Sequence, residues 1–246
     1  MIERPRNAFL RALSDETFEA LSRRLEPVHL SVGDYTHHLE QRIDWVYFPE
    51  GCVLSLITVD EEGRGVETSM VGTEGAGGIL EACAGELASV ECVAQIDGRA
   101  YRAPASFCRE LTASDPGFNI RVMQIADLQM IECRQSGFCQ ASHTAEQRLA
   151  RWLAESSDRA LGRNPLPLTQ EYVAALLGVQ RTTVSIYASA LQREGIIRYR
   201  RGQIEILDFP QLDRRACGCR SIMRRQRRRL GYEALSPAPA SSAIGA

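Results

Sequence analysis

The sequence predicts an α+β protein built from an antiparallel β roll, one long helix, and a helix–turn–helix followed by a β hairpin. Three observations lead to this prediction. Short β-rich runs with a period of two extend from about Val28 to Arg102. A helical pattern begins near Asp115 and continues to Ser136 or Gly137. Between Thr169 and Leu207, two short helical patterns meet at a glycine and two strand patterns follow.

The composition is that of an ordinary folded protein. Hydrophobic residues make up 44% of the 246 residues and charged residues 24%. No apolar run approaches the ~18 residues that span a bilayer. The start, MIERPRNAFLRALSDE, carries charges where a signal peptide would have an apolar core. We therefore expect a cytoplasmic protein with no membrane partner, whose eight cysteines are reduced thiols.

The charges are divided unevenly along the chain. Residues 1–140 contain 12 Arg and 22 acidic residues, a net charge of −10, whereas residues 141–246 contain 17 Arg and 9 acidic residues, a net charge of +8. An acidic half joined to a basic half favours a polyanion-binding module in the basic half. The alternative is that the division reflects solvated faces alone.

The N-terminal part, residues 1–113, is expected to form one domain. Residues 4–26 look helical, with Ser14 as a cap. The runs that follow are separated by turn clusters such as SVGD and DEEGRG, and ITVDEEGRGVETSMV has the pattern of a hairpin. Together they indicate a compact antiparallel β barrel or roll with short helices at its ends.

Residues 114–140 are expected to form the long helix. Ser114 or Asp115 would cap it, with Pro116 in its first turn. Its apolar residues form more than one stripe, and such a helix needs two partners. One would be its own β domain, and the other the same helix of a second subunit. The alternative is a single deeply buried helix.

We assign this segment as a dimerisation helix. The residues assigned to the dimer interface are Phe118, Val122, Ile125 and Leu128. Met123, Met130 and Cys133 form a second stripe.

Residues 141–232 are expected to form the C-terminal domain, and the tail 233–246 to be disordered. Thr169 caps a short amphipathic helix, and Gly178 permits the sharp turn after it. Gln180 or Arg181 begins a second helix whose start is unusually polar. EGIIRYRRGQIEIL then forms a hairpin, and one last helix follows Leu207. Helix, turn, helix and hairpin make a winged helix-turn-helix.

The stretch 143–212 resembles the DNA-binding domain of the Crp/Fnr family of transcription factors. RLARWL, LTQEYVAALLGVQRTTVSIYASALQREGIIRYRRGQIEILD and FPQL carry the resemblance. The β roll and long helix are similar to that family's cyclic-nucleotide-binding-like effector domain, a cupin-like roll, and its dimerisation helix. Membership would imply a homodimer that binds double-stranded DNA at a palindromic operator, with half-sites about one helical turn apart. An activator would also contact RNA polymerase.

The start of the second helix departs from the best-known members of the family. Their pattern is Arg-Glu-Thr-Val with a second Arg two positions on, whereas this chain places Thr182 at the Glu position and Ile186 at the second Arg position. We therefore expect a different operator. The expected base contacts are Gln180, Arg181, Thr182 and Ser185, and the expected phosphate contacts are Thr169, Gln170, Thr183, Arg200 and Arg201. For each of them the alternative is a solvated surface residue.

Binding of cyclic AMP is not expected. Cyclic-AMP-binding relatives hold the phosphate with an Arg-Ser pair, where this chain has Ser89 and Val90, and no Arg occurs between Arg64 and Arg99. A cyclic phosphate buried without a cation would lose its hydration for little return. An unidentified small-molecule effector, or none, stays open. The missing arginine also argues against the alternative function, a cyclic-nucleotide-binding signalling module.

No enzyme motif, cofactor site or metal site is assigned. Nucleophile motifs and paired acid sites are lacking. Iron–sulfur relatives have a cysteine cluster near the N-terminus, but the first cysteine here is Cys52. Cys217 and Cys219 could form half of a metal or redox site, but a lone pair at this spacing is a weak signal. The run Arg224–Arg229 could contact phosphate, lie in solvent, or meet the acidic N-terminal half.

Overall fold

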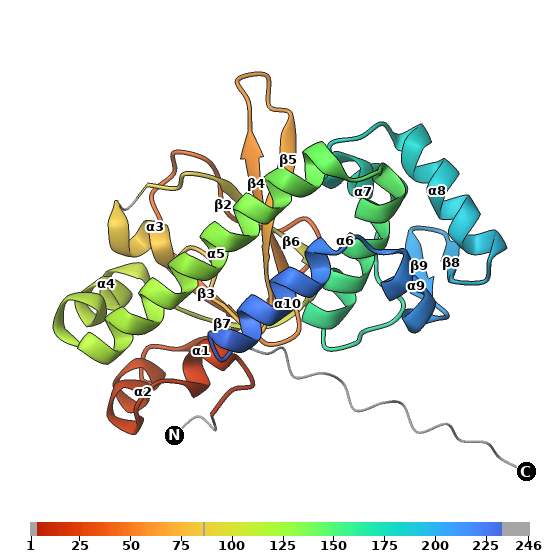
Figure 1. Ribbon diagram of the computed structural model, residues 1–246. Coiled ribbons are helices and arrows are strands. Elements are labelled where there is room, and N and C mark those ends of the chain that lie inside the picture. Colours follow the sequence, from red (N-terminus) through yellow and green to blue (C-terminus); the bar gives the residue numbers. More distant parts are fainter. Residues whose placement is uncertain (1–3, 86, 233–246) are drawn as a thin grey trace, which may run out of the picture.

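The computed structural model describes residues 4–85 and 87–232, and the tail expected to be disordered lies outside this range (Figure 1). The first part contains α1 (Ala8–Arg11), α2 (Asp15–Ser22), β1 (Glu26–Leu30), β2 (Tyr35–His37), β3 (Trp45–Pro49), β4 (Val53–Val59), β5 (Gly65–Val71), α3 (Ile79–Ala84), β6 (Glu91–Ile96), β7 (Gly98–Pro104) and α4 (Ala105–Ser114). The second contains α5 (Pro116–Ser142), α6 (Ala145–Arg159), α7 (Gln170–Leu177), α8 (Arg181–Arg193), β8 (Ile197–Arg200), β9 (Gln203–Ile206), α9 (Phe209–Arg215) and α10 (Cys219–Arg229).

The β roll consists of two antiparallel sheets, ordered β1-β7-β3 and β2-β6-β4-β5. The predicted hairpin is confirmed, because β4 and β5 pair antiparallel from Leu54 and Val71 out to Val59 and Gly65. In Figure 1 this hairpin projects from the roll toward the top of the view. The helical segment expected over residues 4–26 is two short helices instead, since Ser14 accepts a hydrogen bond from the backbone N–H of Thr17 and starts a new helix there.

The long helix α5 begins where the sequence predicts and ends later. The Asp115 carboxylate caps it by accepting from the backbone N–H groups of Gly117 and Phe118. The helix continues past Gly137 to Ser142, beyond the expected end at residue 136 or 137. A glycine inside a helix costs only about 1 kcal/mol. Burial of Cys139 in the following turn offsets that cost.

The four residues assigned to the dimer interface are buried within their own chain and are not on its surface. Phe118, Val122, Ile125 and Leu128 are at most 4% exposed and pack in the core of their own chain. The large hydrophobic side chains of α5 that are exposed are Ile120, Met123, Met130 and Phe138. Periodicity shows that the helix has two apolar stripes, but only the packing of the roll decides which stripe the chain itself covers.

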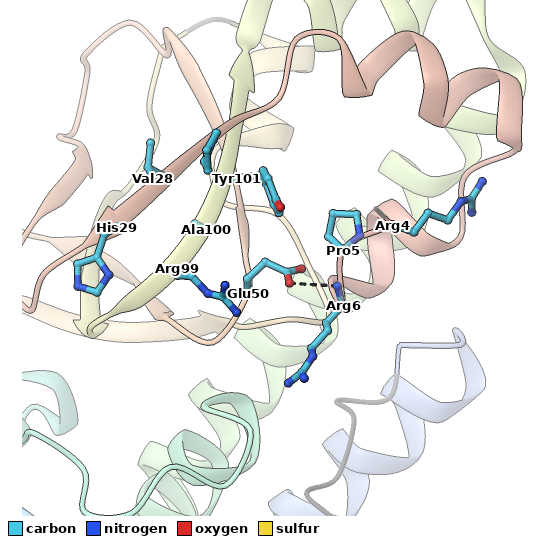
Figure 2. A pocket seen from close by; sticks show the side chains of 10 residues that line it. Arg4, Pro5, Arg6, Val28, His29, Glu50, Arg99, Ala100 and Tyr101 are labelled. Atoms are coloured by element: carbon cyan, nitrogen blue, oxygen red, sulfur yellow. Dashed lines mark hydrogen bonds between the residues drawn. The ribbon is translucent and has the colours of Figure 1, made fainter. Parts of the chain in front are cut away.

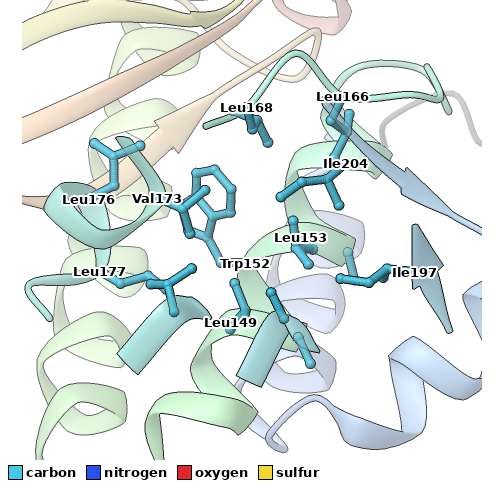
Figure 3. Packing of buried hydrophobic residues seen from close by; sticks show 14 of the residues in the cluster. Leu149, Trp152, Leu153, Leu166, Leu168, Val173, Leu176, Leu177, Ile197 and Ile204 are labelled. Carbon is cyan, nitrogen blue, oxygen red and sulfur yellow. The ribbon is translucent and has the colours of Figure 1, made fainter. Parts of the chain in front are cut away.

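The C-terminal part folds around Trp152 of α6. Figure 3 shows Leu149, Leu153, Val173 and Ile204 gathered about it from α6, α7 and β9. After Leu207 the chain forms two helices, α9 and α10, rather than the single one expected, because the segment 216–218 interrupts them. Within residues 4–85 and 87–232, none of the helices combines the length and the apolar character needed to cross a bilayer.

The winged helix-turn-helix is docked on the β roll. Val53, Ile57 and Met70 of the roll share one buried cluster with the core around Trp152. The Trp152 indole N–H donates to the Glu67 carboxylate of β5 at 2.7 Å, and Ser55 Oγ lies 2.5 Å from the same carboxylate. The two parts therefore meet through apolar packing and a buried polar contact.

Glu67 makes this contact sensitive to pH. Burial raises the pKa of its carboxyl from 4.5 to about 7, against the opposing effect of the hydrogen bonds from Ser55 and Trp152. Protonated Glu67 can donate to Ser55 Oγ, which in turn donates to Gln95 Oε1 at 2.8 Å. The protonated form thus completes the hydrogen-bond chain without a buried charge.

We expect Glu67→Gln to remove this pH dependence. Because the folded-state pKa is raised, the stabilising contribution of Glu67 is present below about pH 4.5 and is lost as the pH rises through about 7. The pKa difference corresponds to about 3 kcal/mol at most. Urea unfolding should show equal stabilities of the two proteins near pH 4.5 and a more stable variant near pH 8. Glu61→Gln, in the exposed turn of the same hairpin, is the control, and parallel curves for Glu67→Gln and wild type would refute the assignment.

Candidate nucleic-acid interface

The helix–turn–helix is formed by α7 and α8. Thr169 caps α7 by accepting from the backbone N–H of Tyr172 at 3.1 Å. Gly178 ends it in the left-handed conformation, with φ of 61°. A Cβ atom at Gly178 would lie 2.9 Å from a methyl group of Val66 in β5. Glycine is therefore required both for the turn and for the close approach of the β4–β5 hairpin.

The two faces of α8 differ in chemistry. Val184, Ala188 and Leu191 are buried and attach the helix to the core. On the outward face Arg181 and Thr182 are exposed, and Ile186 is 65% exposed. Figure 1 places α8 at the edge of the molecule, away from α5.

The other predicted base contacts differ in their exposure. Gln180 precedes the helix and is exposed, and its side chain makes no capping bond. Ser185 is half-buried. Within the chain, Arg181 forms an ion pair with Glu171, whose carboxylate lies 3.8 Å from the Arg181 Nε. Both side chains are more than two-thirds exposed. Such an exposed pair is worth little, so Arg181 remains available to another partner.

The hairpin β8–β9 forms the wing and confirms the predicted strands. Ile197 pairs with Ile206 and Arg200 with Gln203, and the turn at residues 201–202 has positive φ angles. A Cβ atom on Gly202 would lie 3.5 Å from the Thr169 methyl group. The wing tip, with exposed Arg200 and Arg201, is therefore next to the start of α7.

The remaining residues of the phosphate set are less exposed. Gln170 opens α7 and Thr183 lies in the first turn of α8, and both are half-buried. The structure thus brings the wing arginines and the starts of α7 and α8 to one side of the C-terminal part.

Residues 147–215 match the family model described as the Crp-like helix-turn-helix domain. The whole fold is similar to a CRP/FNR-family transcriptional regulator from Thermus thermophilus, at 27% identity and a TM-score of 0.62, over 78% of this chain and 98% of that one. The chain belongs to the Crp/Fnr family. It is a DNA-binding transcriptional regulator.

Other solved structures have the same fold at lower identity. FixK2 from Bradyrhizobium japonicum matches with a TM-score of 0.66 at 16% identity, over 79% of this chain and 98% of that one. A putative crp/fnr-family regulator from Eubacterium rectale matches with a TM-score of 0.65 at 19% identity, over 83% and 95%. A search of curated protein sequences finds no match to this chain. The fold class predicted from the sequence is confirmed.

A cavity of about 530 Å³ lies against the β roll of this Crp/Fnr regulator (Figure 2). Arg4, Arg6 and Arg99 line it together with His29 and Glu50. Glu50 accepts hydrogen bonds from the backbone N–H groups of residues 6 and 7, at 3.1 and 2.6 Å, which fastens the N-terminal segment to the roll.

The positions that correspond to the family's phosphate cassette lie elsewhere. Ser89 and Val90 precede β6 and do not line this cavity.

The arginine run of α10 has a definite partner. Arg227 is buried and its guanidinium contacts Glu132 of α5 at 3.0 Å and Glu155 of α6 at 2.8 Å. Three roles were open for the run Arg224–Arg229: contact with phosphate, exposure to solvent, or contact with acidic residues of the chain. For Arg227 the structure shows the third. Arg225 and Arg229 are exposed on the opposite side.

One group of residues was missed in the sequence. Cys217 and Cys219 lie beside Cys139 and His143, and their four ligand atoms are all within 4.8 Å of one another. The local signal was the spacing of Cys139 and His143, which places both on one face at the end of a helix. The sequence could not show that Cys139 lies beside Cys217, because 78 positions separate the two cysteines.

Proposed function

We propose that the protein is a homodimer that binds a near-palindromic operator, with α8 of each subunit in the major groove. The observation that carries this proposal is the exposed polar start of α8, whose side chains have few partners within the chain. N-terminal residues of such a helix contact base edges in helix-turn-helix proteins. Residues 1–113 would form the effector domain, 114–140 the dimerisation segment and 141–232 the DNA-binding domain.

Arg181 is assigned the main base contact. A guanidinium can bond both O6 and N7 of guanine, the commonest specific contact. Thr182 offers a methyl group for thymine, and Gln180 and Ser185 offer further donors and acceptors. The phosphate contacts, which position the protein without reading sequence, are assigned to Thr169, Gln170, Thr183, Arg200 and Arg201.

The second subunit would pack on the exposed stripe of α5. Ile120 and Met123 are 58% and 57% exposed, and Met130 and Phe138 are 51% and 56% exposed. These positions repeat at spacings close to those of a coiled-coil seam. A homodimer would cover this stripe with its own copy and would set the distance between the two copies of α8.

Control of this regulator would come from the β roll. Because the winged helix-turn-helix is docked on β4 and β5, a ligand that alters the roll can shift the dimer between DNA-competent and incompetent arrangements. An effector, if the protein has one, would be a small molecule other than cyclic AMP, since the cassette arginine is missing.

We expect Arg181→Ala to weaken operator binding by about 10- to 100-fold and to relax the preference at one base pair in each half-site. The operator is first isolated by enrichment of genomic fragments on the wild-type protein. Binding is then titrated at two salt concentrations. Arg193→Ala, exposed at the far end of the same helix, is the matched control and should bind as wild type does.

Arg201→Ala should behave differently from Arg181→Ala. Loss of a phosphate contact weakens binding to all sequences alike and lowers the salt slope by about one. Enrichment of no preferred sequence, or unchanged selectivity in Arg181→Ala, would contradict the assigned role of α8.

A further inference from the structure

A compact cluster of four metal-ligating side chains lies where the long helix ends. Cys139 Sγ is 3.4 Å from Cys217 Sγ, and Cys219 Sγ is 3.5 Å from His143 Nδ1. The three cysteines are at most 4% exposed and form a buried cluster of their own. The imidazole of His143 closes the remaining side and is half-buried.

Two separate parts of the chain contribute to this cluster. Cys139 lies in the last turn of α5, and His143 is the residue at which that helix ends. Cys217 lies in the turn after α9, and Cys219 is the first residue of α10. In Figure 1, α10 lies along α5.

We propose that Cys139, His143, Cys217 and Cys219 bind one divalent cation with tetrahedral geometry, and that this cation is Zn²⁺. Thiolate and imidazole ligands in this combination are typical of structural zinc sites. Tetrahedral Zn–S bonds of about 2.3 Å place two sulfurs about 3.8 Å apart. The separations of 3.4 and 3.5 Å, with all four atoms within 4.8 Å, are close to that geometry.

The surroundings suit a site that carries negative charge. Three thiolates and one Zn²⁺ sum to a net charge of −1 with a neutral imidazole. Arg148 and Arg151, both buried, interact electrostatically with Cys139 and Cys217. Among the described residues, the Nε atoms of both guanidinium groups have no hydrogen-bond partner. Arg151 also faces Glu155 and Glu67, so it serves the interdomain contact as well.

Hydrogen bonding also prepares the sulfurs for a metal. The Gln135 amide donates to Cys219 Sγ at 3.0 Å, as outer-sphere donors do at thiolate sites. Cysteine binds metals as the thiolate, and a donor to its sulfur favours that form.

Metal binding here would hold the junction between α5 and α6 in one conformation. His143 ends α5, and Thr144 caps α6 with a complete capping box, so the direction of the chain changes at this point. A cation bound to both α5 and α10 would hold the C-terminal part at a fixed angle to the long helix. This consequence for DNA rests on the proposed function, whereas the binding of the cation does not.

The test uses the full-length protein, reduced, freed of metal with a chelator and titrated with Co²⁺ and then Zn²⁺. We expect one Co²⁺ per chain, with the visible bands of tetrahedral cobalt bound to thiolates, and displacement by one Zn²⁺. The double variant Cys217→Ser/Cys219→Ser should lose the bands and bind at least about 100-fold more weakly. Cys133→Ser, an exposed cysteine of the same α5, is the matched control and should bind as wild type does.

A second readout separates loss of the site from loss of the fold. Zn²⁺ should raise the Tm of the reduced wild type and of Cys133→Ser, and leave that of the double variant unchanged. The proposal is overturned if the reduced wild type binds less than one cation per chain or gives no tetrahedral cobalt spectrum. It is also overturned if the protein isolated without oxygen shows the absorption of an iron–sulfur cluster, or if the double variant binds as wild type does. Because these readouts involve no DNA, their failure is distinct from failure of operator binding.

Discussion

Replacing Arg159 by Met is expected to lower the free energy of unfolding by about 3–5 kcal/mol. This arginine is 2% exposed, and its guanidinium contacts carboxylates from three segments of the chain. Its Nε lies 2.6 Å from Glu74 beyond β5, its Nη2 lies 2.5 Å from Glu132 of α5, and its Nη1 contacts Glu155 of α6. The variant would leave these buried carboxylates with too few cations, and an unpaired buried charge is far costlier than a missing surface pair.

Urea unfolding at neutral pH measures this loss. Arg200→Met, at the exposed wing tip, is the control and should change stability by less than about 0.5 kcal/mol. The stability of Arg159→Lys should lie between those of the two variants. An ammonium group keeps the charge but lacks the planar set of donors with which a guanidinium can bind three carboxylates. A wild-type-like midpoint for Arg159→Met would show that the cluster does not stabilise the fold.

Acid should also weaken this cluster. Burial alone would raise the pKa of Glu155, but Arg227 and Arg159 hold the pKa of that carboxyl well below its usual range. A lowered folded-state pKa gives stability that is present above about 4.5 and lost as the pH falls. Glu155 therefore acts in the opposite direction to Glu67, whose pKa is raised.

Replacing Met130 by Glu is expected to convert the proposed dimer to a monomer and to weaken operator binding by about 100-fold or more, because the avidity of two joined half-sites is lost. Met130 is 51% exposed on the stripe that we propose packs against the second subunit. In a symmetric helix pair the two new carboxylates would face each other or lie in an apolar seam. Sedimentation measures the first effect, and titration of the full operator measures the second.

Two further variants make this prediction specific. Leu39→Glu, which alters a 39% exposed leucine of the roll, should remain dimeric. Val122→Glu, at a position 1% exposed, should unfold the chain rather than dissociate it, since that side chain is in the core of its own subunit. A Met130→Glu protein that stays dimeric at low concentration would place the interface elsewhere.

The residues of the candidate DNA interface could be predicted because their signals are local. Thr169, Gly178 and the polar residues 180–183 lie within one helix–turn–helix, where caps, a left-handed glycine and a period of 3.6 act over a few positions. The exposure of Arg181 and Thr182 follows from the burial of Val184 and Leu191 on the other side of the same helix.

By itself, the sequence determined the β roll, the long helix and the winged helix-turn-helix of this Crp/Fnr regulator, their order, and the polar face of α8. Only the tertiary structure decided which stripe of α5 the chain buries, that Arg159 and Arg227 meet the same carboxylates, and that Cys139 lies beside Cys217. The physical reason is range. Helix caps, helical hydrogen bonds and hairpin turns act between residues a few positions apart, whereas ion clusters and metal ligands depend on how distant segments pack.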